Sequence, residues 1–478
     1  MMFKHTLIYF LSKGVPGIIN FVAIALYTRL LSPEEYGEYA LVIAAVTFVN
    51  TTLFHWLRLG LLRYNPKFEG NQKTMFISSV TATFISMSIL TIFLGTGAFV
   101  VYTPAHSLAL LWFLGIGLLT MQSIFDLFTE YLRSELASKL FGVVTSLKVV
   151  LSLVFSYLLI RFFDFGGEGI VLGLILGIFF SIVFFIPRYS YLINIKMIDK
   201  EMIREVVIYS VPFIAALSME AIILNTDRYL IGWMMDTKAV GIYAVSYDLA
   251  KQILFLLMMI INLAAYPLVV KALETGGIKE CQKQLNQNTT LLLMVSFPAT
   301  AGMILLSSSF TDIFLGEQFQ GKAAIIFSLI AFAIFIQGFK MYYFDLAFQL
   351  GKNTKLQIWP VLAAAVLNVL LNLLLIPKYG IFGSAYATII SYILSVLLSA
   401  WIGKRIFPLT FPIKEVGKII IATGIMGITI WPALSLNGIS GFIAQIIIGM
   451  IVYTIVILIL NVSNFRNLFF KRLRKTSH

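Results

Sequence analysis

Long apolar stretches recur along the whole chain, and short polar segments separate them. Each stretch has enough residues to cross about 30 Å of hydrocarbon as a helix that rises 1.5 Å per residue. The pattern predicts an all-α membrane protein with about 14 transmembrane helices, over residues 6–31, 36–60, 75–101, 106–131, 140–161, 168–190, 207–233, 239–270, 286–309, 323–349, 356–377, 380–403, 415–435 and 440–462.

The charges of the connecting segments predict an orientation. Most of the 35 Lys and Arg residues fall at the two termini and in alternate connections, 63–74, 132–139, 191–206, 271–285, 350–355 and 404–418. The opposite connections hold few: Arg29, Arg161, Lys238, Lys322 and Lys378. Because loops rich in Lys and Arg stay in the cytoplasm, we expect a multi-pass protein of the cell inner membrane with both termini cytoplasmic. The connections are too short to hold a soluble domain.

Composition narrows the function classes. Hydrophobic residues make up 59% of the chain and charged residues 12%, whereas soluble domains are less apolar and about twice as charged. The net charge of +13 does not indicate a nucleic-acid partner, since the basic residues sit between apolar stretches. Cys281 is the single cysteine, which excludes an internal disulfide, and the four histidines form no zinc motif. We expect no cofactor and no metal site.

Two sets of motifs recur in the same order and predict an internal repeat. Spans one to six map onto seven to twelve, and an even number per copy gives a parallel repeat. Chance similarity between apolar helices is the alternative. The matched elements are Pro16, Arg29 and 36–40 with Pro212, Arg228 and 240–244, and 166–169 with 380–383. The predicted organisation is two six-helix bundles, a terminal helix pair and a basic cytoplasmic tail, over 1–200, 201–408, 409–464 and 465–478.

Charged residues inside the predicted spans are few and informative. An ionised side chain within a bilayer usually faces a wet cavity or a partner of opposite charge. Simple ion pairing is the alternative for each, and Asp248 and Lys251 have the i, i+3 spacing of a helical pair. The basic residues are Lys13, Arg58, Lys148, Arg228, Lys251 and Lys340, and the acidic ones are Asp126, Glu130, Glu220, Asp227, Asp248 and Asp345.

Three motifs resemble the polysaccharide transporter family, which includes the O-antigen and capsule repeat-unit flippases of the multidrug/oligosaccharidyl-lipid/polysaccharide exporter superfamily. The first is the Leu-Ser-x-x-x-Tyr-Gly-x-Tyr element at 31–39. The second is 225–232 followed by 240–244, and the third is the loop 315–319. Gly37 and Gly241 within these motifs are interpreted as architectural, allowing a tight turn or close helix packing.

The resemblance implies a flippase that moves lipid-linked oligosaccharide repeat units, of the undecaprenyl-diphosphate type, for surface polysaccharides such as lipopolysaccharide O-antigen. Membrane lipid would be its surroundings, and a glycan polymerase and a chain-length regulator its partners. The implied cavity cations, on spans one, two, seven and eight, are Lys13, Arg58, Arg228 and Lys251. A buried carboxyl could carry a coupling proton or bind sodium, and the candidates are Asp126, Glu220 and Asp248.

Two other functions were weighed. A cation-coupled exporter of small amphipathic compounds belongs to the same superfamily, but such proteins usually have twelve spans. A membrane enzyme would need a larger outside loop and a paired-acid constellation, so none is expected. The segment 316–322 has the spacing of a phosphate-binding loop, but Ala323 follows where a hydroxyl is needed. ATP hydrolysis is therefore not expected.

Overall fold

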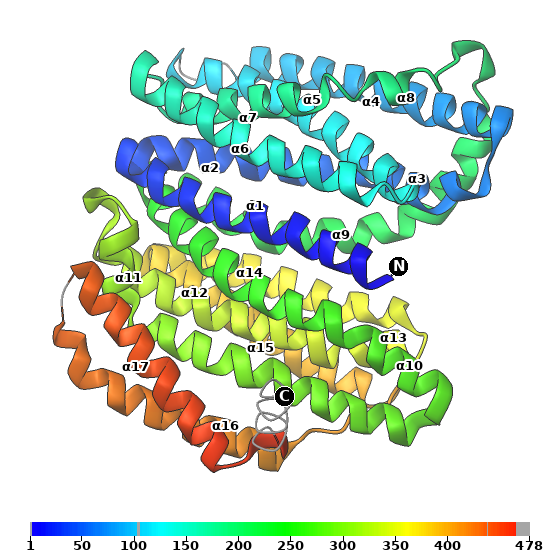
Figure 1. Ribbon diagram of the computed structural model, residues 1–478. Coiled ribbons are helices and arrows are strands. Elements are labelled where there is room, and N and C mark those ends of the chain that lie inside the picture. Colours follow the sequence, from blue (N-terminus) through cyan, green and yellow to red (C-terminus); the bar gives the residue numbers. More distant parts are fainter. Residues whose placement is uncertain (1, 103–105, 437, 465–478) are drawn as a thin grey trace, which may run out of the picture. The chain divides into compact units, whose positions relative to one another are not determined.

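The computed structural model in Figure 1 shows a protein built from helices. The structure describes the backbone of residues 2–102, 106–436 and 438–464, and the side chains of 14–101, 109–187, 189–210, 214, 218–219, 221–223, 225–436 and 438–463. Within those backbone ranges every regular element is a helix and no strand occurs. The predicted all-α class is confirmed. The predicted basic tail, 465–478, lies outside the described residues.

The helices of the first half are α1 (Met2–Leu30), α2 (Pro33–Val49), α3 (His55–Tyr64), α4 (Gly70–Tyr102), α5 (His106–Ser134), α6 (Ser138–Phe163), α7 (Gly167–Ile182), α8 (Pro187–Ser190) and α9 (Lys200–Met234). Those of the second half are α10 (Thr237–Leu305), α11 (Ser307–Phe314), α12 (Lys322–Phe339), α13 (Leu346–Leu350), α14 (Ile358–Tyr379), α15 (Ile381–Gly403), α16 (Ile413–Ile430) and α17 (Gly438–Ile459). Two π-helical turns interrupt this series, η1 (Asn50–Phe54) and η5 (Lys340–Phe344).

Among the described residues, 10 helical segments are long and apolar enough to cross a membrane, and two shorter ones, Gly14–Leu30 and Gly167–Ile182, are also apolar. The chain is therefore a multi-pass membrane protein. The fourteen predicted spans fall mainly on helical residues, and the sixth also includes the turn between α7 and α8. The eighth and ninth spans both lie on α10, whose 69 residues would extend far beyond one bilayer. Gly277, with φ 70° and ψ −165°, breaks α10 within the predicted cytoplasmic connection 271–285.

The chain divides into two compact units, residues 1–244 and 245–478. Helix α9 belongs to the first unit because it packs against α2, α3 and α4. The boundary between the two compact units, after residue 244, thus lies beyond α9. The predicted boundary between the bundles, at residues 200 and 201, lies at the start of α9. The six-helix repeat remains a prediction, since a repeat and a packing unit need not share a boundary.

Small residues hold α6 and α7 together in the first unit. A Cβ on Gly173 would lie within 2.7 Å of the backbone of Ser156, and a Cβ on Gly177 within 2.7 Å of that of Ser152. Hydrocarbon offers no hydrophobic drive for two helices to associate, so close backbone approach supplies the dispersion contacts instead. The second unit uses serine in a comparable way on α15, where Ser384, Ser391 and Ser399 are fully buried.

This packing predicts a large effect of a single methyl group. We expect Gly173→Ala to lower the stability of the detergent-solubilised protein by about 1–3 kcal/mol, because the methyl overlaps Ser156. Thermal unfolding monitored by tryptophan fluorescence measures the change. Gly97→Ala is the matched control, since nothing lies within 4 Å of its Cβ position. Equal melting temperatures for the two variants would contradict the packing argument.

Candidate functional site

A π-helical turn interrupts the second span between α2 and α3. This turn, η1, begins at Asn50 and ends at Phe54. A π turn holds an extra residue, so it rotates the positions after it relative to those before it. The side chains of Asn50, the first residue of the turn, and of Arg58, on α3 after it, both reach the same carboxylate on α5. Such turns are frequent at functional sites.

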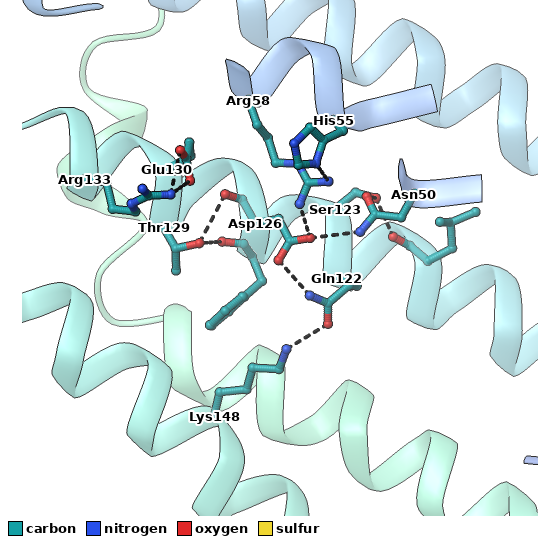
Figure 2. A network of polar contacts seen from close by, with 12 residues as sticks. Asn50, His55, Arg58, Gln122, Ser123, Asp126, Thr129, Glu130, Arg133 and Lys148 are labelled. Atoms are coloured by element: carbon teal, nitrogen blue, oxygen red, sulfur yellow. Dashed lines mark hydrogen bonds and ion pairs between the residues drawn. The ribbon is translucent and has the colours of Figure 1, made fainter. Parts of the chain in front are cut away.

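That carboxylate is Asp126, and three donors, one each from η1, α3 and α5, converge on it (Figure 2). Its Oδ2 accepts from Nη1 of Arg58 at 2.5 Å and from Nδ2 of Asn50 at 2.8 Å. Its Oδ1 accepts from Nε2 of Gln122, one helical turn earlier, at 2.7 Å. Both oxygens are thus satisfied by the protein. The side chains of Arg58 and Asp126 are only 14% and 19% exposed.

A second shell of contacts extends this network (Figure 2). Nη2 of Arg58 lies 2.8 Å from Nδ1 of His55. Because a guanidinium only donates, His55 accepts there and its imidazole is neutral. On the other side, Nζ of Lys148 donates to Oε1 of Gln122 at 2.8 Å and lies 4.4 Å from the centroid of the Phe125 ring. Gln122 therefore bridges the carboxylate and the lysine.

Basic groups outnumber acidic ones in this network. Two basic side chains, Arg58 and Lys148, are linked to one carboxylate, Asp126, directly and through Gln122. Among the described side chains, no group of three or more His, Cys, Asp and Glu could hold a metal ion. Arg58 carries a planar fork of donors, a chemistry that matches the oxygens of a phosphate.

Among the described side chains, the structure pairs Arg58 with Asp126, both of them predicted site residues. Arg228 is buried elsewhere in the first unit, beside Asp227, whose Oδ2 accepts from the hydroxyl of Tyr243 at 2.7 Å. In the second unit Nζ of Lys251 lies 5.9 Å from the Tyr247 ring. Asp248 is partly buried one turn earlier on α10. The side chains of Lys13 and Glu220 lie outside the described residues.

Sequence reasoning missed three members of the network, Asn50, His55 and Gln122. The i, i+4 spacing of Gln122 and Asp126 is a readable signal, because it places the two side chains on one helix face. The contribution of Asn50 depends on the π turn, for which the sequence gives no direct signal. Lys148 was recognised as an intramembrane cation but not assigned to a site.

The second unit contains a contrasting ion pair at its own π turn, η5. Nζ of Lys340 donates to Oδ2 of Asp345 at 2.7 Å, and the two side chains are 8% and 3% exposed. The same carboxylate accepts from Gln357 at 3.2 Å and from Ser399 at 2.9 Å. Charge is balanced here and helices of three spans are joined. This cluster is consequently structural, whereas the network at Asp126 has one basic group more than its carboxylate.

These features define a helical membrane protein with a cationic polar network inside a bundle. The chain belongs to the family described as polysaccharide biosynthesis protein, whose pattern matches residues 26–324. It is 23% identical to a probable low-salt glycan biosynthesis flippase of Haloferax volcanii over 51% of this chain and 53% of that one. It is 30% identical to the lipid II flippase MurJ of Thermosipho africanus over 39% of each chain.

The matched segment spans about half the length of the first of these curated relatives. A longer match, 22% identical over 85% of this chain and 100% of the other, is a capsular polysaccharide biosynthesis protein of Staphylococcus aureus. Among solved structures, a lipid II flippase MurJ in an inward closed conformation matches with a TM-score of 0.74 at 20% identity, covering 98% of this chain and 100% of that one. An inward-facing multidrug resistance MATE family transporter has a TM-score of 0.65 at 12% identity, covering 86% and 98%. At these identities the likeness establishes the fold.

The network predicts an asymmetric response to removing its anion. Asp126→Ala leaves Arg58 without its carboxylate partner in a largely buried position, so we expect a loss of about 3 kcal/mol of stability. The melting temperature in detergent measures the loss. The control is Glu130→Ala, one turn along α5, which removes only an i, i+3 contact to the half-exposed Arg133 and should cost under about 1 kcal/mol. Equal losses of stability for the two variants would show that the Asp126 ion pair contributes no more than a partly exposed pair within one helix.

Proposed function

We propose that this protein is a flippase that moves lipid-linked oligosaccharide repeat units, carried on an undecaprenyl-diphosphate type of lipid, across the cytoplasmic membrane. The observation that carries the proposal is the excess of basic over acidic groups in the network formed by Arg58, Lys148 and Asp126 inside a membrane helix bundle. The family of polysaccharide biosynthesis proteins, and relatives described as flippases, support it.

The chemistry of the substrate explains the need for such a cation. A diphosphate between lipid and sugar is too strongly hydrated to cross hydrocarbon unaided, since bare charges are costly there. Charge-assisted hydrogen bonds from a guanidinium replace part of its hydration. In the resting network Asp126 occupies one edge of Arg58, which keeps the guanidinium oriented and its charge partly offset. An arriving phosphate competes for the same donors.

The mechanism we propose is alternating access, in which the head group enters from the cytoplasm and the sugar leaves on the other side while the lipid tail stays in the bilayer. The inner-membrane location and the cytoplasmic termini follow from the distribution of Lys and Arg. Lys13, Arg228 and Lys251 are further cavity cations in this scheme. Asp248 and Glu220 are carboxyls for a coupling proton or sodium ion. Asp126 is less suited to that task, since its oxygens already accept from Arg58, Asn50 and Gln122.

The second candidate is a cation-coupled exporter of small amphipathic compounds, favoured by the fold likeness to a MATE family transporter. That likeness covers 86% of this chain, whereas the MurJ structure covers 98%. The helices α16 and α17 are an addition to the twelve-span plan usual for such exporters. Lipid-linked substrates are therefore the better fit, with a glycan polymerase and a chain-length regulator as downstream partners.

Replacing Arg58 tests the flippase directly. We expect Arg58→Ala to reduce surface polysaccharide at least tenfold, because the phosphate loses its bidentate partner. Lipid-linked repeat units should accumulate inside the cell. Arg58→Lys should restore only part of the activity, since lysine keeps the charge and loses the planar fork. The measurements are surface glycan by gel electrophoresis and lipid-linked intermediates by mass spectrometry.

Arg133→Ala is the matched control for Arg58→Ala, because Arg133 is 45% exposed and pairs only with its helix neighbour Glu130 among the contacts resolved here. It should leave surface glycan unchanged. Membrane abundance of each variant must be equal for the comparison to count. If Arg58→Ala left surface glycan intact but abolished efflux of amphipathic cations, the exporter would replace the flippase.

The orientation has its own test. A single cysteine in place of Lys238, in a Cys281→Ala background, should react with a membrane-impermeant maleimide added to spheroplasts. A single cysteine in place of Lys279 should react only after the membrane is permeabilised. Both residues are on the surface of the fold, so burial does not decide the outcome. The opposite labelling pattern would invert the proposed topology.

A further inference from the structure

The end of α3 packs closely against the beginning of α9 within the first unit. A Cβ added to Gly60 would overlap the side chain of Val206, which is fully buried. This close approach brings together Tyr64, one turn after Gly60, and Tyr209, about one turn after Val206. Their rings meet edge to face, with centroids 5.8 Å apart and an angle of 87° between the ring planes. The predicted second and seventh spans thus meet at a pair of tyrosines.

Each of the two tyrosines has a basic side chain over its ring. The guanidinium carbon of Arg63 lies 5.7 Å from the centroid of Tyr209, and Nζ of Lys67 lies 4.9 Å from that of Tyr64. Both basic residues are exposed. Because the two rings contact each other, the two cations belong to one assembly. We call Arg63, Tyr64, Lys67 and Tyr209 the tyrosine–cation cluster.

A neighbouring cation of the same predicted connection, Lys73, is held in a different way. Its Nζ donates to Oε1 of Glu135 at 2.6 Å. Within the side chains that the structure describes, neither Arg63 nor Lys67 forms an ion pair with a carboxylate. A carboxylate takes up the N–H donors of its partner, whereas a ring face attracts the charge and leaves most donors free. The cluster therefore positions two cations and keeps their donors for another acceptor.

Two adjacent cations suit a ligand with two adjacent anionic groups. A diphosphate carries its charges on two phosphates that share one bridging oxygen, whereas the phosphodiester of an ordinary phospholipid carries a single charge. The planar fork of an arginine binds phosphate oxygens in pairs, and a lysine adds a compact charge beside it. The composition of the cluster, Arg63 with Lys67, thus favours a diphosphate.

We propose that the tyrosine–cation cluster is a docking site for the diphosphate of the lipid-linked substrate at the cytoplasmic face. Arg58 lies on the same helix, five residues before Arg63, which is about 7.5 Å along the helix axis. Arg63 is exposed and Arg58 is largely buried, so an anion that arrives from the cytoplasm meets Arg63 first. The two side chains contact different helices, α9 and α5, so the cluster is a site separate from the network at Asp126. The inference rests on the proposed function and on the predicted orientation.

Binding of a soluble isoprenyl diphosphate tests the site without transport. The probe is farnesyl diphosphate, titrated by calorimetry into the full chain in phosphatidylcholine nanodiscs. All proteins carry Arg58→Gln, so that the network at Asp126 does not contribute. We expect Arg63→Gln combined with Lys67→Gln to weaken binding at least tenfold, because both cations are lost. Lys139→Gln removes another exposed cation of the predicted cytoplasmic side and should leave the affinity unchanged. Equal affinities with and without the double substitution would overturn the proposal.

A second titration separates a diphosphate from the phosphate of a phospholipid. In nanodiscs of equal parts phosphatidylcholine and phosphatidylglycerol, the protein should still bind farnesyl diphosphate at least tenfold more tightly than the double variant. If that difference vanished, phosphatidylglycerol would be the occupant of the cluster and the proposal would fall.

The rings have a test of their own, since Tyr64 is a positioning residue in this scheme. Tyr64→Leu should weaken the binding of farnesyl diphosphate at least threefold, because Lys67 loses the ring that holds it. Tyr64→Phe keeps the ring face and should keep the affinity. Equal affinities for these two variants would contradict the proposed role of the ring.

The cellular test keeps Arg58 intact. The double substitution of Arg63 and Lys67 should lower surface glycan at least threefold at equal membrane abundance, and Lys139→Gln should not. Weakened farnesyl diphosphate binding beside unchanged glycan would exclude the cluster from the transport route and overturn the docking role. Cluster-dependent binding in a protein that exports no glycan would instead refute the flippase and leave the diphosphate site standing.

Discussion

The structure depends on how charged side chains are satisfied inside a bundle that hydrocarbon surrounds. Even after relaxation, burying an ion costs several kcal/mol unless a partner of opposite charge and further hydrogen bonds compensate it. Asp126 meets that condition with donors from Arg58, Asn50 and Gln122. Those donors come from the start of the π turn η1, from α3 after it and from α5, the helix that carries Asp126. The register of the second span against α5 is therefore tied to one carboxylate.

The second unit also buries charged side chains, but there the charges balance. Lys340 and Asp345 neutralise each other in a nearly dry site, and Gln357 and Ser399 complete the carboxylate's hydrogen bonds. A neutral, satisfied cluster has no remaining demand for a ligand. The network at Asp126 has one basic group more than its single carboxylate, and its ion pair has more solvent access. That difference, rather than the presence of buried ions, distinguishes the site that we propose for an anionic head group.

The sequence carried most of the fold and only part of the site. Apolar length predicts the helices because hydrocarbon requires each span to satisfy its own backbone. Apolar length does not reveal that the eighth and ninth spans lie on one helical element. The connection between them is itself helical, apart from the local break at Gly277. Few charged residues fall within the predicted spans, because ions there are costly, and this rarity made Arg58 and Asp126 candidate site residues. Asn50 was not predicted, because an uncharged amide within a span is not by itself a sign of a functional site. Its contact with Asp126 also depends on the rotation at η1.

The starts of α2 and α10 carry the two copies of one short motif and approach each other closely at Gly37 and Gly241. Gly37 and Gly241 were expected to be architectural, and their close backbone packing confirms that expectation. Each glycine contacts the backbone of the other motif, so a side chain added at either glycine would disturb the packing of both motifs. A pair of glycines that shaped two separate turns would carry no such mutual constraint. The two copies are therefore held by one interface, and any motion that separates them must act on both at once.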